Sequence, residues 1–199
     1  MPGLLERQKQ RRRERIYRTA VQLFRERGFH QTTATDIAKA AHVSRGTFFN
    51  YYPYKEAVLL DDGAELLTQL SEQARAELEE GSPPLDVLRR MWERLSEVSE
   101  RERELLSPLA YELLNPDPER ARSAFEALPL GDFVAEVLRP LREAGELRKD
   151  LSLERIARSL ADTYLLSALR WSAYTPERRL KDEMLKFLDL VRLLSYTPH

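Results

Sequence analysis

The 199-residue chain contains no cysteine, only seven glycines and no long apolar run. Without cysteine it can form no disulfide, no thiolate metal site and no thiol redox sensor. No apolar stretch reaches the roughly 18 residues that a membrane-spanning helix needs, and the N-terminus lacks the apolar segment of a signal peptide. We therefore expect a cytoplasmic protein that has no membrane partner.

Other absences limit the fold and the chemistry. Alternating runs of β-branched residues, which are typical of strands, do not occur. The three histidines show no metal-ligand spacing, and none accompanies a plausible nucleophile. No glycine-rich loop suited to phosphate is present. The sequence predicts an all-α protein that is not an enzyme and that has no metal or cofactor.

Charge is unevenly distributed along the chain. Residues 1–55 hold 12 of the 32 basic residues but only four of the 33 acidic residues, so the remainder is acidic. A basic head on an acidic body indicates that the head meets a polyanion, although surface charge also varies by chance. The head contains the run "RQKQRRRER" (residues 7–15), which would either contact DNA, as a salt-sensitive or minor-groove arm, or remain a solvated tail.

Apolar periodicity and helix-stop residues predict helices along the whole chain. We expect them at residues 11–27, 34–41, 44–51, 55–80, 84–105, 105–114, 118–144 with a break at "LPLG", 152–174 and 177–196. The second and third are short and joined by a tight turn, which is the arrangement of a helix-turn-helix DNA-binding unit. Thr33 and Ser44 are the expected N-caps, and His42 occupies the turn position that needs a left-handed backbone.

Helical geometry divides the aromatic stretch "SRGTFFNYYPYKE" (residues 44–56) into two faces. Phe48 and Tyr52 are four residues apart and should point inward against the first helix. The opposite face would read base edges, through an arginine for guanine, an asparagine for adenine, a phenylalanine for a thymine methyl, and a glycine that permits close approach. These candidates are Arg45, Gly46, Phe49 and Asn50. Polar groups around this face are candidates for phosphate contacts, namely Thr33, Thr35, Ser44, Thr47, Tyr51 and Lys55.

The segment "TTATDIAKAAHVSRGTFFNYYPYKEAVLL" (residues 32–60) resembles the DNA-binding segment of tetracycline-repressor-like (TetR family) transcriptional regulators. Thirteen positions match the family pattern in register: Thr32, Thr33, Ile37, Ala38, Ala41, Val43, Ser44, Gly46, Thr47, Tyr51, Lys55, Glu56 and Leu59. Two departures matter. His42 replaces the usual turn glycine, and Phe49 replaces a frequent tyrosine, so a phosphate hydrogen bond is lost there.

The resemblance implies two domains and a regulatory role. Residues 1–54 would form a three-helix DNA-binding domain, and residues 55–199 a helical effector-binding and dimerisation domain. Family members bind double-stranded DNA as homodimers on near-palindromic operators, and a small effector releases them. We expect this chain to be a repressor of this kind. The helix that begins at Lys55 would link the two activities.

The effector site and the dimer interface are predicted from large apolar side chains. An apolar or aromatic effector would fit walls made of Leu88, Met91, Trp92, Leu95, Tyr111, Phe125, Phe133 and Tyr164, although such stripes are more often plain core. The last helix carries the stripe Leu180, Met184, Phe187, Leu188, Val191 and Leu194. That stripe packs either inside the chain's own bundle or against a second copy.

Two other functions remain to be compared with a dimeric repressor. The aromatic cluster would serve a single-strand binder as a stacking platform, but the inward direction of Phe48 and Tyr52 argues against it. An enzyme lacks support in the residue patterns described above.

Overall fold

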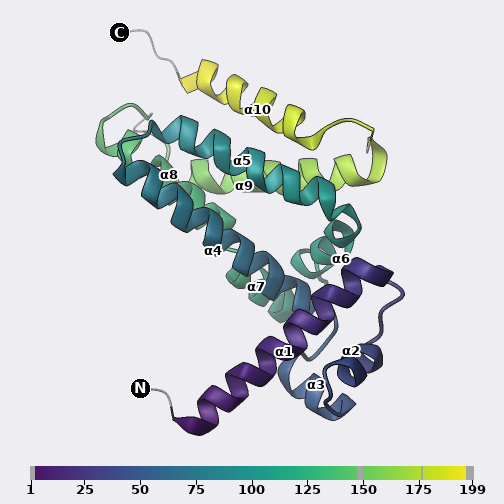
Figure 1. Ribbon diagram of the computed structural model, residues 1–199. Helices are drawn as coiled ribbons and strands as arrows, with labels where there is room; N and C mark the ends of the chain where they lie inside the picture. The colour runs from purple at the N-terminus through teal and green to yellow at the C-terminus, as the bar shows by residue number, and fades with distance from the viewer. Residues whose placement is uncertain (1–2, 148–149, 176, 196–199) are drawn as a thin grey trace. The chain divides into compact units, whose positions relative to one another are not determined.

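A computed structural model describes residues 3–147, 150–175 and 177–195, and the side chains of these ranges up to residue 189. The described residues form ten α-helices and no strand (Figure 1). In chain order these are α1 (Leu4–Arg27), α2 (Ala34–Ala40), α3 (Arg45–Tyr51), α4 (Ala57–Glu79), α5 (Pro84–Arg101), α6 (Arg103–Leu113), α7 (Pro118–Ala127), α8 (Leu130–Glu143), α9 (Leu153–Tyr174) and α10 (Leu180–Ser195). The all-α prediction is therefore confirmed.

The chain folds as two compact units. The first comprises the described residues of Met1–Ala64 together with Tyr111–Ala127, and the second comprises Glu65–Ala110 and the described residues from Leu128 onward. The first unit thus extends ten residues past the expected boundary at residue 54 and also includes α7. Helices α4 and α6 each belong partly to both units.

The first unit is built around α1, which runs past the short helices α2 and α3 (Figure 1). Its core is formed by fully or nearly fully buried residues of these three helices and of the start of α4, among them Ile16, Ala20, Phe24, Ile37, Ala38, Phe48, Tyr52, Val58 and Leu59. Hydrophobic spacing at i, i+4 and i+8 along α1 accounts for the stripe that packs on α2 and α3.

Helix α1 begins at Leu4, well before its expected start at residue 11. The basic run is therefore helical, because arginine, glutamine, leucine and glutamate all favour the helix. Arg13 donates to both carboxylate oxygens of Asp61 on α4 at 2.8 and 2.9 Å, and Arg15 donates to the carbonyl oxygen of Ala41 at 3.1 Å. These two arginines connect the helices of the unit, which neither reading of the run as an arm or a tail anticipated.

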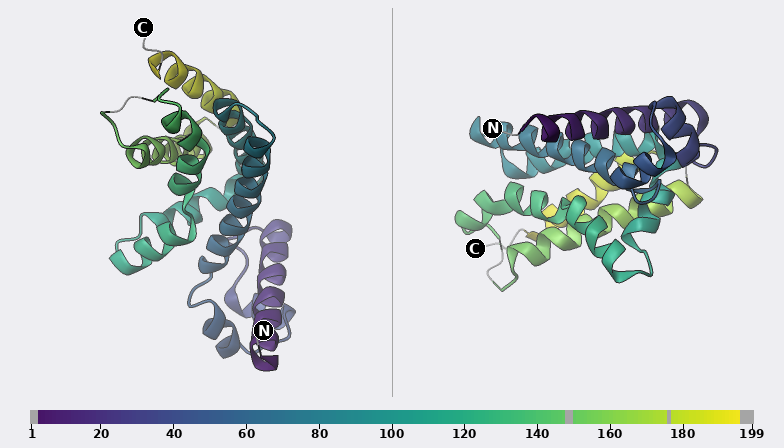
Figure 2. Two further views of the ribbon diagram at one scale, coloured as in Figure 1. Left: turned by 90° about the vertical axis from the view of Figure 1, so that its left-hand side faces the viewer. Right: turned by 90° about the horizontal axis from the view of Figure 1, so that it is seen from below.

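The second unit has an apolar core supplied by α4, α5, α8, α9 and α10. Helix α8 packs on α9, and α10 lies alongside α5 (Figures 1 and 2). Leu180, Met184 and Leu188 of α10 are buried in this core, and Phe187 packs partly against it. The alternative that these residues meet a second copy is thus wrong for the three buried ones, because α5 and α9 already cover them. The side chains of Val191 and Leu194 lie outside the described residues.

None of the helices in the described ranges is both long enough and apolar enough to cross a lipid bilayer.

Candidate nucleic-acid interface and effector cavity

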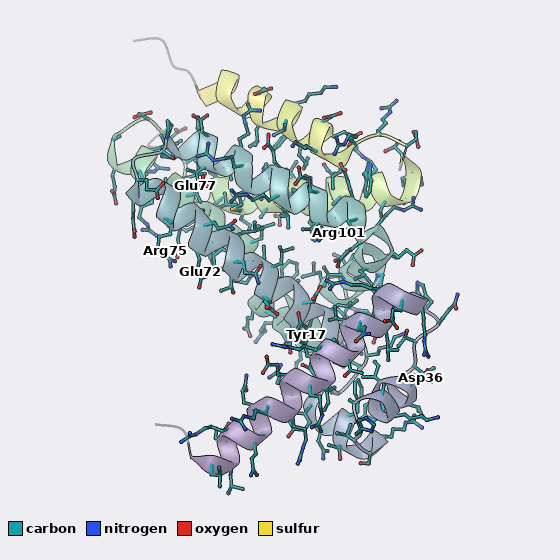
Figure 3. All side chains as sticks on the ribbon, viewed as in Figure 1. Tyr17, Asp36, Glu72, Arg75, Glu77 and Arg101 are labelled. Carbon is teal, nitrogen blue, oxygen red and sulfur yellow. The ribbon has the colours of Figure 1, made fainter. Side chains whose placement is uncertain are left out.

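Helix α2 starts with a reciprocal cap. The hydroxyl of Thr33 accepts from the backbone N–H of Asp36 at 3.1 Å, and the Asp36 carboxylate accepts from the Thr33 backbone N–H at 2.9 Å. The hydrogen bonds from the Thr33 hydroxyl and backbone hold the pKa of Asp36 below its ordinary value. This capping box fixes the start of α2, and Asp36 is labelled in Figure 3.

The turn between α2 and α3 has the left-handed residue that the sequence predicted. His42 has φ 52°, and it is the one residue other than glycine with a positive φ among those described. The backbone N–H of Val43 donates to the carbonyl oxygen of Ala38 at 2.9 Å, which closes the turn against α2. Because histidine tolerates this conformation better than most residues, the departure from glycine leaves the turn intact.

The inner face of α3 fastens it to the unit. Phe48 and Tyr52 are 0% and 1% exposed, as their spacing predicted. The Tyr52 hydroxyl donates to Asp61 Oδ2 at 2.7 Å, and the guanidinium of Arg13 lies over the Tyr52 ring. Burial, followed by the hydrogen bond to Asp61, raises the pKa of Tyr52 far above its ordinary value. Asp61 therefore ties α1, α3 and α4 together through two side chains.

The outer face of α3 presents the four candidate base-reading residues. Arg45, Gly46, Phe49 and Asn50 are all exposed. The Arg45 guanidinium lies 5.5 Å from the centroid of the Phe49 ring, and that ring meets Phe48 edge-on at 5.3 Å. Phe49 thus makes a cation–π contact with Arg45 and an edge-on contact with the buried Phe48.

Gly46 has no steric reason within the protein to be glycine. A Cβ atom built there would meet only the Ser44 hydroxyl oxygen, at an ordinary 3.8 Å. Glycine lowers helix stability relative to alanine, so neither packing within the protein nor helix propensity favours glycine at this position.

Three of the candidate phosphate-binding hydroxyls are engaged in local hydrogen bonds. The Thr33 hydroxyl serves the α2 cap, and the Ser44 hydroxyl accepts from the Thr47 backbone N–H at 2.9 Å and bonds the Thr47 hydroxyl at 2.8 Å. Thr35 is exposed and Tyr51 is half-buried. The hydroxyls of Thr33 and Ser44 therefore serve the starts of α2 and α3 directly, as N-caps.

Lys55 has a partner that the sequence did not reveal. Its ammonium donates to the carbonyl oxygens of Phe29 at 2.7 Å and Thr32 at 3.0 Å, and it lies 3.9 Å from the centroid of the Phe29 ring. Burial lowers the pKa of this ammonium, and Glu56 opposes that effect. Two of its three protons thus hold the loop between α1 and α2.

A second polar cluster surrounds Tyr54, in the segment between α3 and α4. Glu112 is fully buried and accepts from Arg120 at 2.6 and 3.2 Å. The Arg120 guanidinium lies 3.7 Å from the centroid of the Tyr54 ring. Burial, and then the charge of Glu112, raises the pKa of Tyr54. The end of α6 and the start of α7 are thus linked to Tyr54, three residues before α4 begins.

The second unit contains a cavity of about 260 Å³ between α4 and α8. Its lining combines apolar and charged residues, and comprises Ser71, Ala74, Arg75, Leu78, Phe133, Glu136, Val137 and Arg139. Arg75, labelled in Figure 3, pairs with Glu136 at 3.1 Å, whereas Arg139 forms no ion pair with another described residue. Sequence reasoning named only Phe133 among these residues, since isolated arginines on a helix give no signal until the fold brings them together.

The other predicted effector residues divide into two groups. Leu88, Met91, Trp92, Leu95 and Tyr164 all belong to the buried core of the second unit. The expectation that Tyr111 and Phe125 are interior is wrong, because they are 60% and 49% exposed and belong to the first unit. The buried residues of α6 and α7 include Ala110, Leu113 and Ala124. Tyr111 and Phe125 directly follow two of these in sequence but lie on an exposed face of their helices.

Comparison with known families finds two matches that together cover most of the chain. A family model described as "Bacterial regulatory proteins, tetR family" matches residues 16–61. A second, described as "TetR/AcrR family transcriptional repressors, C-terminal domain", matches residues 64–193.

Individual relatives agree with these models. The crystal structure of Thermus thermophilus FadR, a TetR family transcriptional repressor in complex with lauroyl-CoA, is 62% identical, covers 94% of this chain and 96% of that chain, and has a TM-score of 0.88. The transcriptional regulator UidR of Escherichia coli is 25% identical over 75% of this chain and 76% of its own length. The uncharacterised regulator YerO of Bacillus subtilis is 35% identical over 40% of this chain, which spans only 28% of YerO.

Proposed function

The chain belongs to the TetR family of bacterial transcriptional regulators, and from that premise we propose that it is a repressor whose release from DNA is triggered by an acyl-CoA. The observation that carries this proposal is the 62% identity, across nearly the full chain, to a repressor that binds lauroyl-CoA. We further propose that it acts as a homodimer on a near-palindromic operator in the cytoplasm.

The DNA half of the proposal depends on the outer face of α3. Its arginine, asparagine and phenylalanine offer a guanine reader, an adenine reader and an apolar surface for a thymine methyl. Gly46 keeps the backbone bare where the helix enters the major groove. The groups of Thr35, Tyr51 and the third proton of Lys55 would contact phosphates and set the register. Burial of Phe48 and Tyr52 disfavours the alternative of a single-strand binder, which would need their faces for stacking.

The effector half depends on the cavity between α4 and α8. An acyl-CoA combines a long apolar chain with a polyanionic nucleotide, so its site needs an apolar interior beside cationic groups. Phe133 and Val137 supply the apolar part, and Val137 belongs to the same core as Trp92. Arg139 and Arg75 supply the positive charge, and a phosphate would compete with Glu136 for Arg75.

Self-association would use α9 in place of the α10 stripe. Leu166 and Tyr174 on α9 are 69% and 79% exposed and lie eight residues apart on one helix face. Burying these side chains against a second copy would remove apolar surface from water and would pair two copies of the chain, each with its own α3. Such a pair reads two half-sites about one helical turn of DNA apart.

Release follows from linkage between the two ligands. The effector must bind the DNA-incompetent arrangement more tightly than the competent one, and DNA must weaken effector binding by the same factor.

One experiment tests both halves. Purified protein would be used to select bound fragments from a genomic library of duplexes, and lauroyl-CoA would then be titrated into the complex with the selected sequence. We expect a near-palindromic motif, an affinity that falls steeply with salt, and dissociation by lauroyl-CoA but not by coenzyme A alone. Selection of no common motif would refute the DNA half, and a complex unchanged by saturating lauroyl-CoA would refute the choice of effector.

A further inference from the structure

A line of polar side chains crosses the apolar core of the second unit. Trp92, Ser96 and Ser99 lie at positions i, i+4 and i+7 of α5, so they share one face of the helix, and all three are buried. Tyr164 of α9 stacks on Trp92 with ring centroids 5.0 Å apart, and its hydroxyl lies 3.0 Å from the Ser99 hydroxyl. We refer to these four residues as the polar seam.

Two atoms of the polar seam have no hydrogen-bond partner. Among the described residues, Trp92 Nε1 and Ser96 Oγ are the buried side-chain atoms left unpaired. The Ser96 hydroxyl is close enough to the Tyr164 phenol to oppose the rise that burial causes in its pKa, but it lacks the geometry of a hydrogen bond. Trp171, the other tryptophan, donates its indole N–H to the carbonyl oxygen of Arg178. A buried donor without an acceptor is unfavourable, so the seam is suited to receiving one.

The chemistry of the seam specifies what it can receive. An indole N–H is a donor only, and a serine hydroxyl can donate as well. In the pair of Ser99 and Tyr164 one hydroxyl donates to the other, which leaves one further proton to donate. The seam therefore contains two unpaired neutral groups, Trp92 Nε1 and Ser96 Oγ, and one further hydroxyl proton.

No cation accompanies these donors. Apart from Tyr164, the buried polar residues described in this unit are all serines, namely Ser71, Ser96, Ser99 and Ser167. A carboxylate brought into this core would lose its hydration without an opposite charge to compensate it. A neutral carbonyl oxygen suffers no such loss and accepts the same hydrogen bonds.

We propose that the polar seam binds the carbonyl oxygen of the acyl thioester, with Trp92 and Ser96 as its donors. This inference rests on the proposed function, and it implies that a free fatty acid would bind less well than an acyl-CoA. Trp92 and Tyr164 belong to the same apolar core as Val137, which also lines the cavity between α4 and α8. The acyl chain would lie in that core, with the thioester at the seam and the nucleotide near the arginines of the cavity.

The test compares two probes that differ in one oxygen. Lauroyl-CoA carries the thioester carbonyl, and S-dodecyl-CoA replaces it with a methylene group. Calorimetric titration of the full chain should give an affinity for the thioester that is higher by about three- to tenfold, which corresponds to one or two hydrogen bonds. In Ser96→Ala and in Trp92→Phe this preference should fall to about twofold or less, because a donor is lost.

Stability of the ligand-free variants gives a separate measure. Ser96→Ala removes an unpaired hydroxyl, so its melting temperature without ligand should equal or exceed that of the wild type. Trp171→Phe is the matched control. It removes a satisfied indole hydrogen bond, so it should lower the melting temperature and retain the full preference for the thioester.

The outcomes separate the two proposals. Equal binding of both probes by the wild type would overturn the seam as a carbonyl site. This result is expected if a buried water satisfies Trp92 and Ser96. It would not contradict the proposal that the effector is an acyl-CoA. Binding of neither probe would overturn the proposed effector itself. A thioester preference that persists in both Ser96→Ala and Trp92→Phe would place the carbonyl elsewhere.

Discussion

Gly46→Ala should separate the stability of this protein from its DNA binding. Gly46 is the second residue of α3, where a Cβ atom would meet only the Ser44 hydroxyl oxygen at 3.8 Å. The methyl group therefore fits the free protein without strain. The same methyl group would project from the face of α3 that is proposed to enter the major groove. The proposed close contact between α3 and DNA leaves no room for it.

The two effects have opposite signs. Alanine favours the helix over glycine, and at a first-turn position we expect a gain of about 0.5 kcal/mol in the free energy of unfolding. For a chain of this size that corresponds to a melting temperature higher by about 1–2 °C. A methyl group forced into a close-packed interface costs about 1–3 kcal/mol, which weakens operator binding by between about fivefold and a hundredfold.

Thermal unfolding and fluorescence anisotropy with the selected operator measure the two quantities on the same preparations. Gly131→Ala is the matched control, because Gly131 is also the second residue of its helix and its added Cβ would make an ordinary 3.5 Å contact with Arg158. This control should leave operator affinity unchanged. If Gly46→Ala bound the operator within twofold of wild type, the proposed close approach of α3 to DNA would be refuted.

Three further changes test contacts that hold the first unit together. Lys55→Met leaves two loop carbonyl oxygens without their donor. It should lower the free energy of unfolding, measured by urea denaturation, by about 2 kcal/mol. Unchanged stability together with weaker operator binding would instead assign Lys55 to phosphate contact alone. Arg120→Met leaves the buried Glu112 carboxylate unpaired, so the free energy of unfolding, measured in the same way, should fall by about 3 kcal/mol. A fall no larger than that caused by breaking an exposed ion pair would contradict this account. The folded-state pKa of Asp36 lies below its ordinary 3.8, so the stability that the α2 cap contributes is complete above pH 3.8 and is lost as the pH falls through the folded-state pKa. Asp36→Asn should flatten this part of the acid denaturation profile. An unchanged profile would contradict this role of Asp36.

Features that depend on neighbouring residues could be predicted well. The caps at Thr33 and Ser44, the left-handed turn at His42 and the inward direction of Phe48 and Tyr52 all follow from hydrogen bonds and spacings within a few residues. Their physical causes operate inside single helices and turns, so the sequence contains them directly.

Features that depend on distant residues were missed or wrong. The basic run was expected either to contact DNA or to remain solvated, and the pairing of Arg13 with Asp61, 48 residues away, was missed. The α10 stripe had two equally good partners until α5 and α9 covered it. Tyr111 and Phe125 are as apolar as true core residues, and only the packing of α6 and α7 leaves them exposed.

The sequence by itself determined the all-α architecture, the helix-turn-helix and the family, because periodicity, capping and a fixed-spacing motif are local properties. The tertiary structure alone decided which polar groups meet. It paired Lys55 with the loop carbonyls, stacked Arg120 on Tyr54, and left Trp92 and Ser96 unpaired in an apolar core. Such pairings require segments far apart in the chain to pack together, and no short-range pattern specifies which of many similar side chains will be brought into contact.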